Sequence, residues 1–309
     1  MSGIVFLFPG QGSQSVGMDA HISEHPAASG LLEEAGRMSG VPHLLEVIRS
    51  GPEDLLTRTD NVQPGITAVS LATLRILSGK GIGASAAAGH SLGEYSALCC
   101  AGVLSAESAL RLTARRGALM QSCADRYPGG MAALVGVSRE EAEQIAAGAA
   151  SAGKVGIANI NSEGQVVISG DAQAVQKATE IARERGVRRV IPLRVSGAWH
   201  SPLMAEAAEG LAEALAAEVF SEPSIPVVAN VTSGFIGSGA ESRALLARQV
   251  TSPVLWAASM RRLVKEGYRT FVEVGPGSVL QGLLRGFEGL GVYGTGTAEA
   301  LERTLVELS

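Results

Sequence analysis

The chain has 309 residues, of which 46% are apolar and 18% are charged, and its formal net charge at pH 7 is −5. This balance favours a folded protein with a large core and excludes a disordered chain, and the negative charge gives no indication of nucleic-acid binding. The 39 glycines and an aromatic content of 4% favour an α/β protein with tight turns.

The start of the chain and the cysteines indicate the compartment. The first residues carry no basic region, their apolar run is too short for a secretory signal peptide, and no later segment resembles a membrane span. Cys99, Cys100 and Cys123 show neither metal-ligand spacing nor a Cys-x-x-Cys motif. We therefore expect a cytoplasmic protein with reduced cysteines, no bound metal and no membrane contact.

The first part of the chain has an α/β pattern. Residues 4–8 form an apolar run that predicts a buried first strand, and Gln63-Pro64 predicts the start of a helix that reaches Leu77. Residues 84–88 are small and have poor strand propensity, so only the motif that follows them predicts a strand there. A further helix is expected from Ser105, as its N-cap, to about Cys123.

The pattern changes between about residues 129 and 193. Strand-like and helix-like segments follow one another in the order β-α-β-β-α-β, which is the ferredoxin-like motif, and Asp171 is expected to cap the second of its helices. Strand-like segments at 226–230 and 270–274 then resume the α/β pattern. We predict a large α/β-hydrolase-like domain with a parallel sheet, formed by residues 1–127 and 195–309, and an inserted ferredoxin-like domain at 128–194.

A candidate nucleophile lies at residues 89–93, where Gly-His-Ser-Leu-Gly matches the nucleophile elbow G-x-S-x-G. In such an elbow a sharp strand-to-helix turn exposes the serine hydroxyl, and the helix N-terminus offers free N–H groups to an oxyanion. The pattern also arises by chance in a chain rich in glycine and serine. Its place between a small-residue run and a helix favours the functional interpretation for Ser91.

A serine nucleophile needs a base, normally histidine. His90 adjoins the serine and is expected to point away from it as a packing residue, whereas His21, His25 and His43 resemble surface residues. His200 follows the last inserted strand, where the two domains are expected to form a cleft. His200 is therefore the preferred base.

Arg116 is a candidate substrate ligand. It falls within the apolar stripe of the helix that begins near Ser105, whereas Arg115 falls on the side expected to face solvent. A buried guanidinium needs an anionic partner, which can be a structural carboxylate or the carboxylate of a substrate.

The glycine-rich turn after the first strand, residues 9–14, does not fit a dinucleotide-binding fingerprint because Ser15 stands where the third glycine is required. Such a turn can instead present backbone N–H groups to an oxyanion.

Taken together, these motifs resemble the malonyl-CoA:acyl carrier protein transacylase family, the FabD-like acyltransferases. The resemblance is collinear and covers nearly the whole chain. Its segments are Phe-Pro-Gly-Gln-Gly-Ser-Gln at 8–14, Gly-His-Ser-Leu-Gly-Glu-Tyr-Ser-Ala at 89–97, Arg-Gly at 116–117, Met-Gln at 120–121, Asn161, Gly-Ala-Trp-His-Ser at 197–201, Asn-Val-Thr at 230–232, Arg-Gln at 248–249 and Glu-Val-Gly-Pro-Gly at 273–277.

The resemblance implies a role for each matching position. Ser91 would be acylated, with His200 as its base. The backbone N–H groups of Gln11 and Leu92 would form the oxyanion hole, and Arg116 would bind the malonyl carboxylate. The backbone carbonyl of Gln249 would orient His200. The cleft would be lined by Asn161, Trp199 and Met120. Trp199 is a departure, because relatives usually carry Phe before the base; its bulk is expected to favour malonyl over branched malonyl groups.

The resemblance also implies ping-pong transfer of malonyl from malonyl-CoA, through an ester on Ser91, to the phosphopantetheine thiol of an acyl carrier protein. No cofactor is expected, the carrier would be an acidic and transient partner, and the protein is expected to be a monomer. Two basic clusters, at 183–189 and at 261–265, are candidates for the docking face, although either is also explained as solvated surface charge.

Other functions share parts of this pattern. A serine hydrolase or thioesterase uses the same elbow but needs an acid and then a histidine after the serine, and a continuous sheet. The malonyltransferase subunit of a malonate decarboxylase, or an enzyme of polyketide synthesis, would carry the same motifs. An inactive scaffold is disfavoured because Ser91, His200 and Arg116 are all present.

Overall fold

The computed structural model describes residues 3–309, and residues 1–2, on which part of the expectation about the chain start falls, lie outside it. The strands are β1 (Ile4–Phe8), β2 (Ala86–Gly89), β3 (Gly129–Val135), β4 (Val155–Ser162), β5 (Gln165–Asp171), β6 (Arg189–Pro192), β7 (Val227–Val228), β8 (Thr270–Glu273) and β9 (Gly291–Gly294). The α-helices are α1 (Pro26–Ser39), α2 (Leu44–Ser50), α3 (Glu53–Thr57), α4 (Thr59–Gly79), α5 (Gly93–Cys100), α6 (Ala106–Arg126), α7 (Arg139–Gly148), α8 (Ala172–Glu184), α9 (Ala205–Ala216), α10 (Gly239–Gln249), α11 (Trp256–Lys265), α12 (Val279–Leu283) and α13 (Ala298–Leu308).

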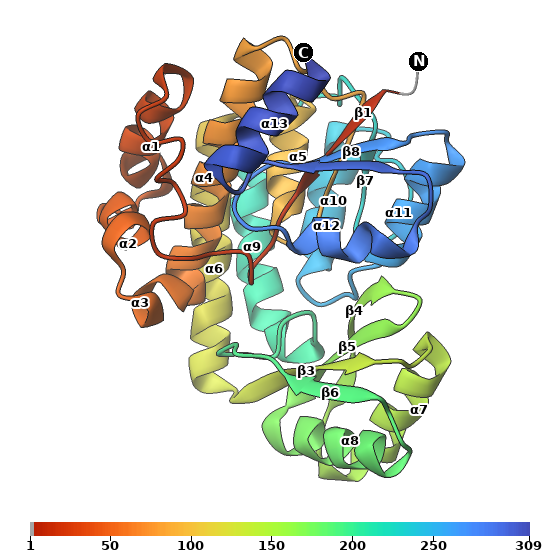
Figure 1. Cartoon of the computed structure of the whole chain (residues 1–309). Coiled ribbons are helices and arrows are strands. Elements are labelled where there is room, and N and C mark those ends of the chain that lie inside the picture. Colours follow the sequence, from red (N-terminus) through yellow and green to blue (C-terminus); the bar gives the residue numbers. More distant parts are fainter. Residues whose placement is uncertain (1–2) are drawn as a thin grey trace.

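A parallel sheet forms the centre of the larger body, with strand order β7-β2-β1-β8-β9. Helices cover both of its faces (Figure 1), so alternate residues of each strand enter different cores. In β1, Phe6 and Phe8 pack with α4, α5 and α6, whereas Val5 and Leu7 pack with α11 and α12. The apolar run of β1 is therefore required on both faces.

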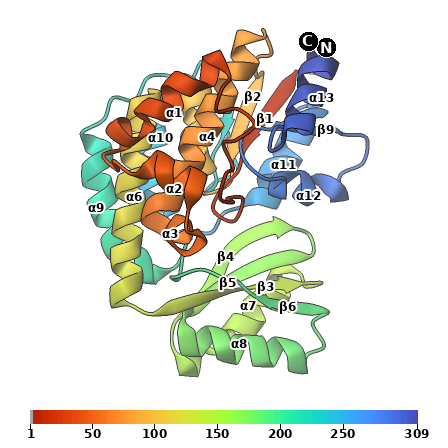
Figure 2. The same ribbon diagram turned by 60° about the vertical axis from the view of Figure 1, so that its left-hand side comes forward.

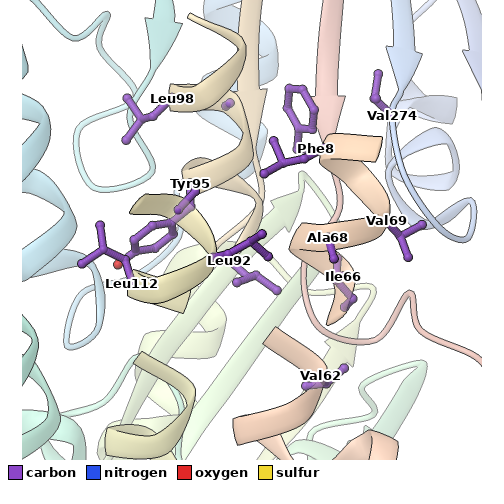
Figure 3. Packing of buried hydrophobic residues seen from close by; sticks show 14 of the residues in the cluster. Phe8, Val62, Ile66, Ala68, Val69, Leu92, Tyr95, Leu98, Leu112 and Val274 are labelled. Carbon is purple, nitrogen blue, oxygen red and sulfur yellow. The ribbon is translucent and has the colours of Figure 1, made fainter. Parts of the chain in front are cut away.

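Strand β2 consists of three alanines and a glycine, all buried between β1 and β7. Its weak intrinsic strand propensity is overridden by the pairing on both sides. Small side chains let helix α5 approach the sheet closely; Figure 3 shows Leu92, Tyr95 and Leu98 packed with Phe8 and with residues of α4 and α6.

The smaller body is an antiparallel sheet with the order β4-β5-β3-β6, covered on one face by α7 and α8 (Figure 2). This is the ferredoxin-like fold, so the predicted fold class is confirmed. Its strands lie between residues 129 and 192. The domain limits at 127/128 and 194/195 stay a prediction, because no observation identifies separate folding units.

The two sheets are tied together through β4. Ile160 donates its N–H to the carbonyl of Val254 at 2.9 Å, and Val254 donates its own to Ala158 at 2.9 Å. The face of the small sheet away from its helices carries Met131, Ala133 and Val167, which belong to the same core cluster as the large sheet. The uncovered face of the small sheet is thus turned toward the large body.

Two local predictions were wrong. Helix α4 begins at Thr59 rather than at Gln63-Pro64, with Pro64 inside it. Pro64 removes only the hydrogen bond to the carbonyl four residues earlier, and the burial of the first turn keeps that turn helical. Asp171 precedes α8 but does not cap it, since its carboxylate accepts the N–H of Lys154 instead.

Helices α4 and α6 cross closely because of a glycine. A Cβ atom on Gly117 would lie 2.4 Å from the carbonyl oxygen of Thr59. The contact places Arg116, the residue before Gly117, beside Gln63 of α4. Arg116 is buried and Arg115 is exposed, as the helical periodicity predicted. Among residues 3–309, no helix combines the length and apolar character required to cross a bilayer.

Candidate active site

A cleft of about 470 Å³ lies between the large sheet and the small sheet. Its walls contain every predicted site residue except Gln249, which lies behind them. The predicted residues in its lining are Gln11, Ser91, Leu92, Arg116, Met120, Asn161, Trp199 and His200. The structure therefore brings together residues that span nearly two hundred positions of the sequence.

The elbow at Ser91 depends on the glycines that flank it. Ser91 has a φ of 50°, a left-handed conformation that non-glycine residues rarely adopt. A Cβ on Gly89 would lie 2.0 Å from the carbonyl carbon of Gly93, and a Cβ on Gly93 would lie 2.0 Å from the carbonyl oxygen of Phe8. No side chain fits at either position, so this tight turn between β2 and α5 requires both glycines.

Ser91 and His200 are hydrogen-bonded in the cleft. Ser91 Oγ lies 2.7 Å from His200 Nε2, and His200 Nδ1 lies 2.9 Å from the carbonyl oxygen of Gln249 and 3.1 Å from that of Ser252. Two carbonyl oxygens can only accept, so Nδ1 carries the proton and Nε2 is free to accept the serine proton. No carboxylate is needed to fix this tautomer.

His200 is held as a neutral imidazole. Burial lowers its pKa to about 3, with a further contribution from the positive charge of Arg116. It also has a φ of 58°, so both members of the pair occupy left-handed backbone conformations. Such strain is found where the surrounding structure enforces a functional geometry.

Two residues that line the cleft have backbone amides without a protein partner among the described residues. Within residues 3–309, the N–H groups of Gln11 and Leu92 donate to no protein atom. Leu92 directly precedes helix α5, and Gln11 belongs to the turn after β1, next to Gly10, whose Cβ would lie 2.5 Å from the carbonyl of His90. The close approach of the two turns gives a pair of donors suited to an oxyanion.

Arg116 is 2% exposed and forms its hydrogen bonds with neutral groups. Nη1 donates to Gln63 Oε1 at 2.7 Å, and Nη2 donates to Gln249 Oε1 at 3.0 Å and to Ser91 Oγ at 3.0 Å. Burial lowers its pKa, and among residues 3–309 no ion pair joins it to a carboxylate. The structural carboxylate considered as its partner from the sequence is therefore not in contact with it.

Two glutamines position Arg116, and sequence reasoning missed both of these roles. Gln63 is fully buried on α4 and donates to Thr59 Oγ1 at 2.9 Å, while Thr59 in turn donates to the side chain of Gln11 at 3.0 Å. The side chain of Gln249, as well as its carbonyl, reaches the site. A buried glutamine on an apolar helix face was the available signal for Gln63.

Glu94 and Asn230 were also missed, although both lie in the motifs quoted above. Asn230 accepts the N–H of Ser91 at 2.6 Å and donates to the carbonyl of Gly89 at 2.6 Å, so it fixes the elbow. Glu94 is 1% exposed and accepts from Gln249 Nε2 at 2.5 Å and from the N–H of Asn230 at 3.4 Å. The only sequence signal for these roles was a polar residue at a buried position: Glu94 within a buried helix and Asn230 just after a buried strand.

The remaining histidines are engaged elsewhere. The ring of His90 packs 5.3 Å from that of Trp256, and its Nε2 lies 2.9 Å from Asn161 Oδ1, so it points away from Ser91 as expected. His43 is exposed, as predicted. The half-buried His25 accepts a hydrogen bond at the start of α1, and the half-buried His21 contacts the carbonyl of Thr295.

Other predicted features can be located, although their roles stay predictions. Asn161 holds His90, and Trp199 is 5% exposed with an indole N–H that has no partner among the described residues. Residues 3–309 contain no group of three acidic, cysteine or histidine side chains placed to bind a metal. In the second basic cluster Arg261 pairs with Glu163, so part of that charge is already neutralised.

Comparisons with known proteins agree with this geometry. The acyl transferase domain family matches residues 5–291. The malonyl CoA-acyl carrier protein transacylase of Bacillus subtilis is 42% identical over 92% of this chain and 90% of its own, and that of Haemophilus influenzae is 37% identical over 99% and 100%.

Solved structures of transacylases are also similar to this chain. The crystal structure of the FabD transacylase from Xanthomonas oryzae has a TM-score of 0.95 at 40% identity, covering 100% of this chain and 99% of that one. A malonyl-transacylase in complex with a type II polyketide synthase acyl-carrier protein has a TM-score of 0.94 at 36% identity, covering 99% and 100%. The chain belongs to the acyl transferase family, among the malonyl-CoA:acyl carrier protein transacylases.

Proposed function

We propose that this protein transfers malonyl groups from malonyl-CoA to the phosphopantetheine thiol of an acyl carrier protein, with Ser91 as the nucleophile. The observation that carries the proposal is the position of Arg116, a buried cation whose Nη2 lies 3.0 Å from Ser91 Oγ and which contacts no carboxylate in the part of the chain that the structure describes. A substrate that forms an ester on Ser91 and bears its own carboxylate would supply the missing anion.

The first half of the reaction follows from the hydrogen bonds at Ser91. Ser91 Oγ attacks the thioester carbon while its proton passes to His200 Nε2, 2.7 Å away. The oxyanion that forms would accept hydrogen bonds from the free amides of Gln11 and Leu92. The carbon–sulfur bond then breaks, and His200 returns the proton to the leaving coenzyme A thiolate, which leaves the malonyl ester on Ser91.

The second half reverses these roles. The carrier's thiol gives its proton to His200 and attacks the ester, the Ser91 oxygen leaves and regains the proton, and malonyl departs on the carrier. A thioester is exchanged for a thioester, so no net oxidation or hydrolysis occurs. Water must be kept from the ester, and the buried surroundings of Ser91 and His200 favour this.

The substrate carboxylate also helps the base. In the free protein the charge of Arg116 contributes to the low pKa of His200. Pairing of Arg116 with the malonyl carboxylate removes that contribution, so the imidazolium that forms during proton transfer becomes less costly. Malonyl would thus be both held and activated by the same contact.

A hydrolase using the same elbow is disfavoured by the site itself. His200 is oriented by two carbonyl oxygens rather than by an acid, and a separate antiparallel sheet, which the hydrolase pattern does not require, forms one wall of the cleft. A role in malonate decarboxylation would use the same site with another carrier. Bound cofactors are not part of the proposed reaction, and the carrier's acidic docking face would meet basic surface near the cleft.

We further propose a monomeric protein in the cytoplasm. Cys99, Cys100 and Cys123 are free thiols, and burial raises the pKa of each, which makes them unreactive and suits a reducing compartment.

Ser91 should take up one malonyl group. Incubation of the intact protein with malonyl-CoA should add one malonyl mass, and digestion should place it on the peptide that contains Ser91. Addition of a holo acyl carrier protein should remove the label and transfer it to the carrier. Label on another residue, undiminished label in Ser91→Ala, or rapid loss to water without a carrier would reject the proposal, the last in favour of a hydrolase.

His200→Ala should slow acylation roughly a hundredfold or more, the usual contribution of a general base. Single-turnover acylation by malonyl-CoA measures this step directly. His90→Ala is the matched control, because it removes a half-buried imidazole that is next to the nucleophile in the chain but does not contact it. Normal acylation by His200→Ala together with slow acylation by His90→Ala would show that the base is wrongly assigned.

Arg116→Ala should cost malonyl transfer about 2–5 kcal/mol, the range for truncating one partner of a buried charge pair. It should affect acetyl-CoA much less, because acetyl has no carboxylate, and Arg116→Lys should rescue only in part, since an ammonium cannot make the two-pronged contact. The measurement is kcat/KM for both thioesters, with the exposed Arg115→Ala as control. Equal losses for both thioesters with a large fall in melting temperature would make Arg116 a purely structural residue.

A further inference from the structure

Glu94 is a buried carboxylate that the reaction described above does not use. It lies on α5, three residues after Ser91, and is 1% exposed. Its Oε2 accepts hydrogen bonds from the side chain of Gln249 and from the N–H of Asn230. A carboxylate in such a position requires a compensating charge or a proton.

Gln249 connects Glu94 with the rest of the site. Its Nε2 donates to Glu94 Oε2 and also to the carbonyl of Ser91 at 3.0 Å, while its Oε1 accepts from Arg116 at 3.0 Å. Its backbone carbonyl accepts from His200 at 2.9 Å. The single amide therefore links the carboxylate of Glu94 to the guanidinium of Arg116 and fixes the orientation of the base.

The net charge of this network differs between the free and the substrate-bound protein. In the free protein Arg116 and an ionised Glu94 together are neutral. When the malonyl carboxylate pairs with Arg116, two carboxylates share one guanidinium in a buried site, and like charges of this kind cannot both remain ionised cheaply. A proton on one of them restores neutrality, and Glu94 is the one that makes no direct contact with Arg116.

On the basis of the proposed function, we infer that Glu94 is a positioning residue that is ionised in the free protein and takes up a proton when a malonyl carboxylate pairs with Arg116. In the free state the Glu94 carboxylate supplies the negative charge that Arg116 otherwise lacks. In the bound state the protonated Glu94 still accepts from Gln249, so the orientation of His200 is kept.

The electrostatic surroundings allow this change near neutral pH. Burial raises the pKa of Glu94 to about 7, against opposing contributions from Gln249, Asn230 and Arg116. The other ionisable groups of the site do not titrate there: burial raises the pKa of Tyr95 on the same helix and lowers those of His200 and His90. Arg248 on α10 is exposed.

Protonation of Glu94 should affect malonyl-CoA and acetyl-CoA differently. Malonyl-CoA should react best with the form in which Glu94 carries a proton, so its kcat/KM should fall as the pH rises above about 7. Acetyl-CoA brings no carboxylate and should show no such decrease. Both substrates carry the same coenzyme A phosphates, so titration of the phosphates affects both alike.

The first experiment measures kcat/KM for acylation of Ser91 from pH 6 to pH 9. With malonyl-CoA the wild-type value should fall roughly tenfold, within the usual range of coupling between two sites, and Glu94→Gln should be flat to within about twofold. Glu273→Gln is the matched control, because Glu273 is also a buried glutamate with a raised pKa but contacts α12 instead of Gln249. It should keep the wild-type slope, and parallel profiles for wild type and Glu94→Gln would overturn the inference.

The second experiment does not depend on the folding of Glu94→Gln. Calorimetric titration of the Ser91→Ala protein with malonyl-CoA at pH 8, in two buffers of different ionisation enthalpy, should show uptake of roughly half a proton or more per site, since binding would raise the pKa of Glu94. Acetyl-CoA should show much less uptake. Equal proton uptake with both thioesters, or none, contradicts the inference. Mass spectrometry of the wild-type protein distinguishes failure of the proposed function from failure of the role of Glu94. If Ser91 is malonylated but no linked proton uptake is found, only the role of Glu94 is rejected. If Ser91 is not malonylated, the proposed function is rejected, and the role of Glu94 with it.

Discussion

The active site depends on one buried positive charge. Arg116 is surrounded by neutral hydrogen-bond acceptors and contacts no carboxylate among residues 3–309, although the desolvation of a guanidinium is costly. Its acidic neighbour Glu94 is linked to it through the side-chain amide of Gln249. A protein retains such an arrangement when a ligand completes it, and the position of the charge beside a serine nucleophile indicates an acyl group with its own carboxylate.

The fold supplies this arrangement through a few close contacts. Gly117 lets α6 cross α4 closely enough for Gln63 to reach Arg116, and Gly89 and Gly93 let the turn after β2 hold Ser91 in a left-handed conformation. The small sheet closes the cleft from the other side, tied to the large body by the bonds between β4 and Val254. Each contact lies near the active site. It restricts the backbone conformation there, and in return it positions the catalytic groups accurately.

Much of this was predictable from the sequence. Local sequence patterns predict the elbow, the buried side of α6 and the order of strands and helices in the inserted region. They do so because helical periodicity and turn-forming residues can be recognised within short stretches of sequence. The start of α4 was not predictable, since tertiary packing overrides the usual effect of Pro64. The side-chain roles of Gln63, Glu94 and Gln249 were missed for a similar reason: they arise from contacts between residues far apart in the chain.

A crystal structure of the malonyl ester on Ser91 would show whether the malonyl carboxylate pairs with the buried charge of Arg116. Trapping requires only malonyl-CoA and the absence of a carrier. We expect both guanidinium Nη atoms of Arg116 to donate to the malonyl carboxylate, with Nη2 no longer bonded to Ser91 Oγ. A carboxylate that points to solvent while Arg116 keeps its bonds to Gln63 and Gln249 unchanged would contradict it.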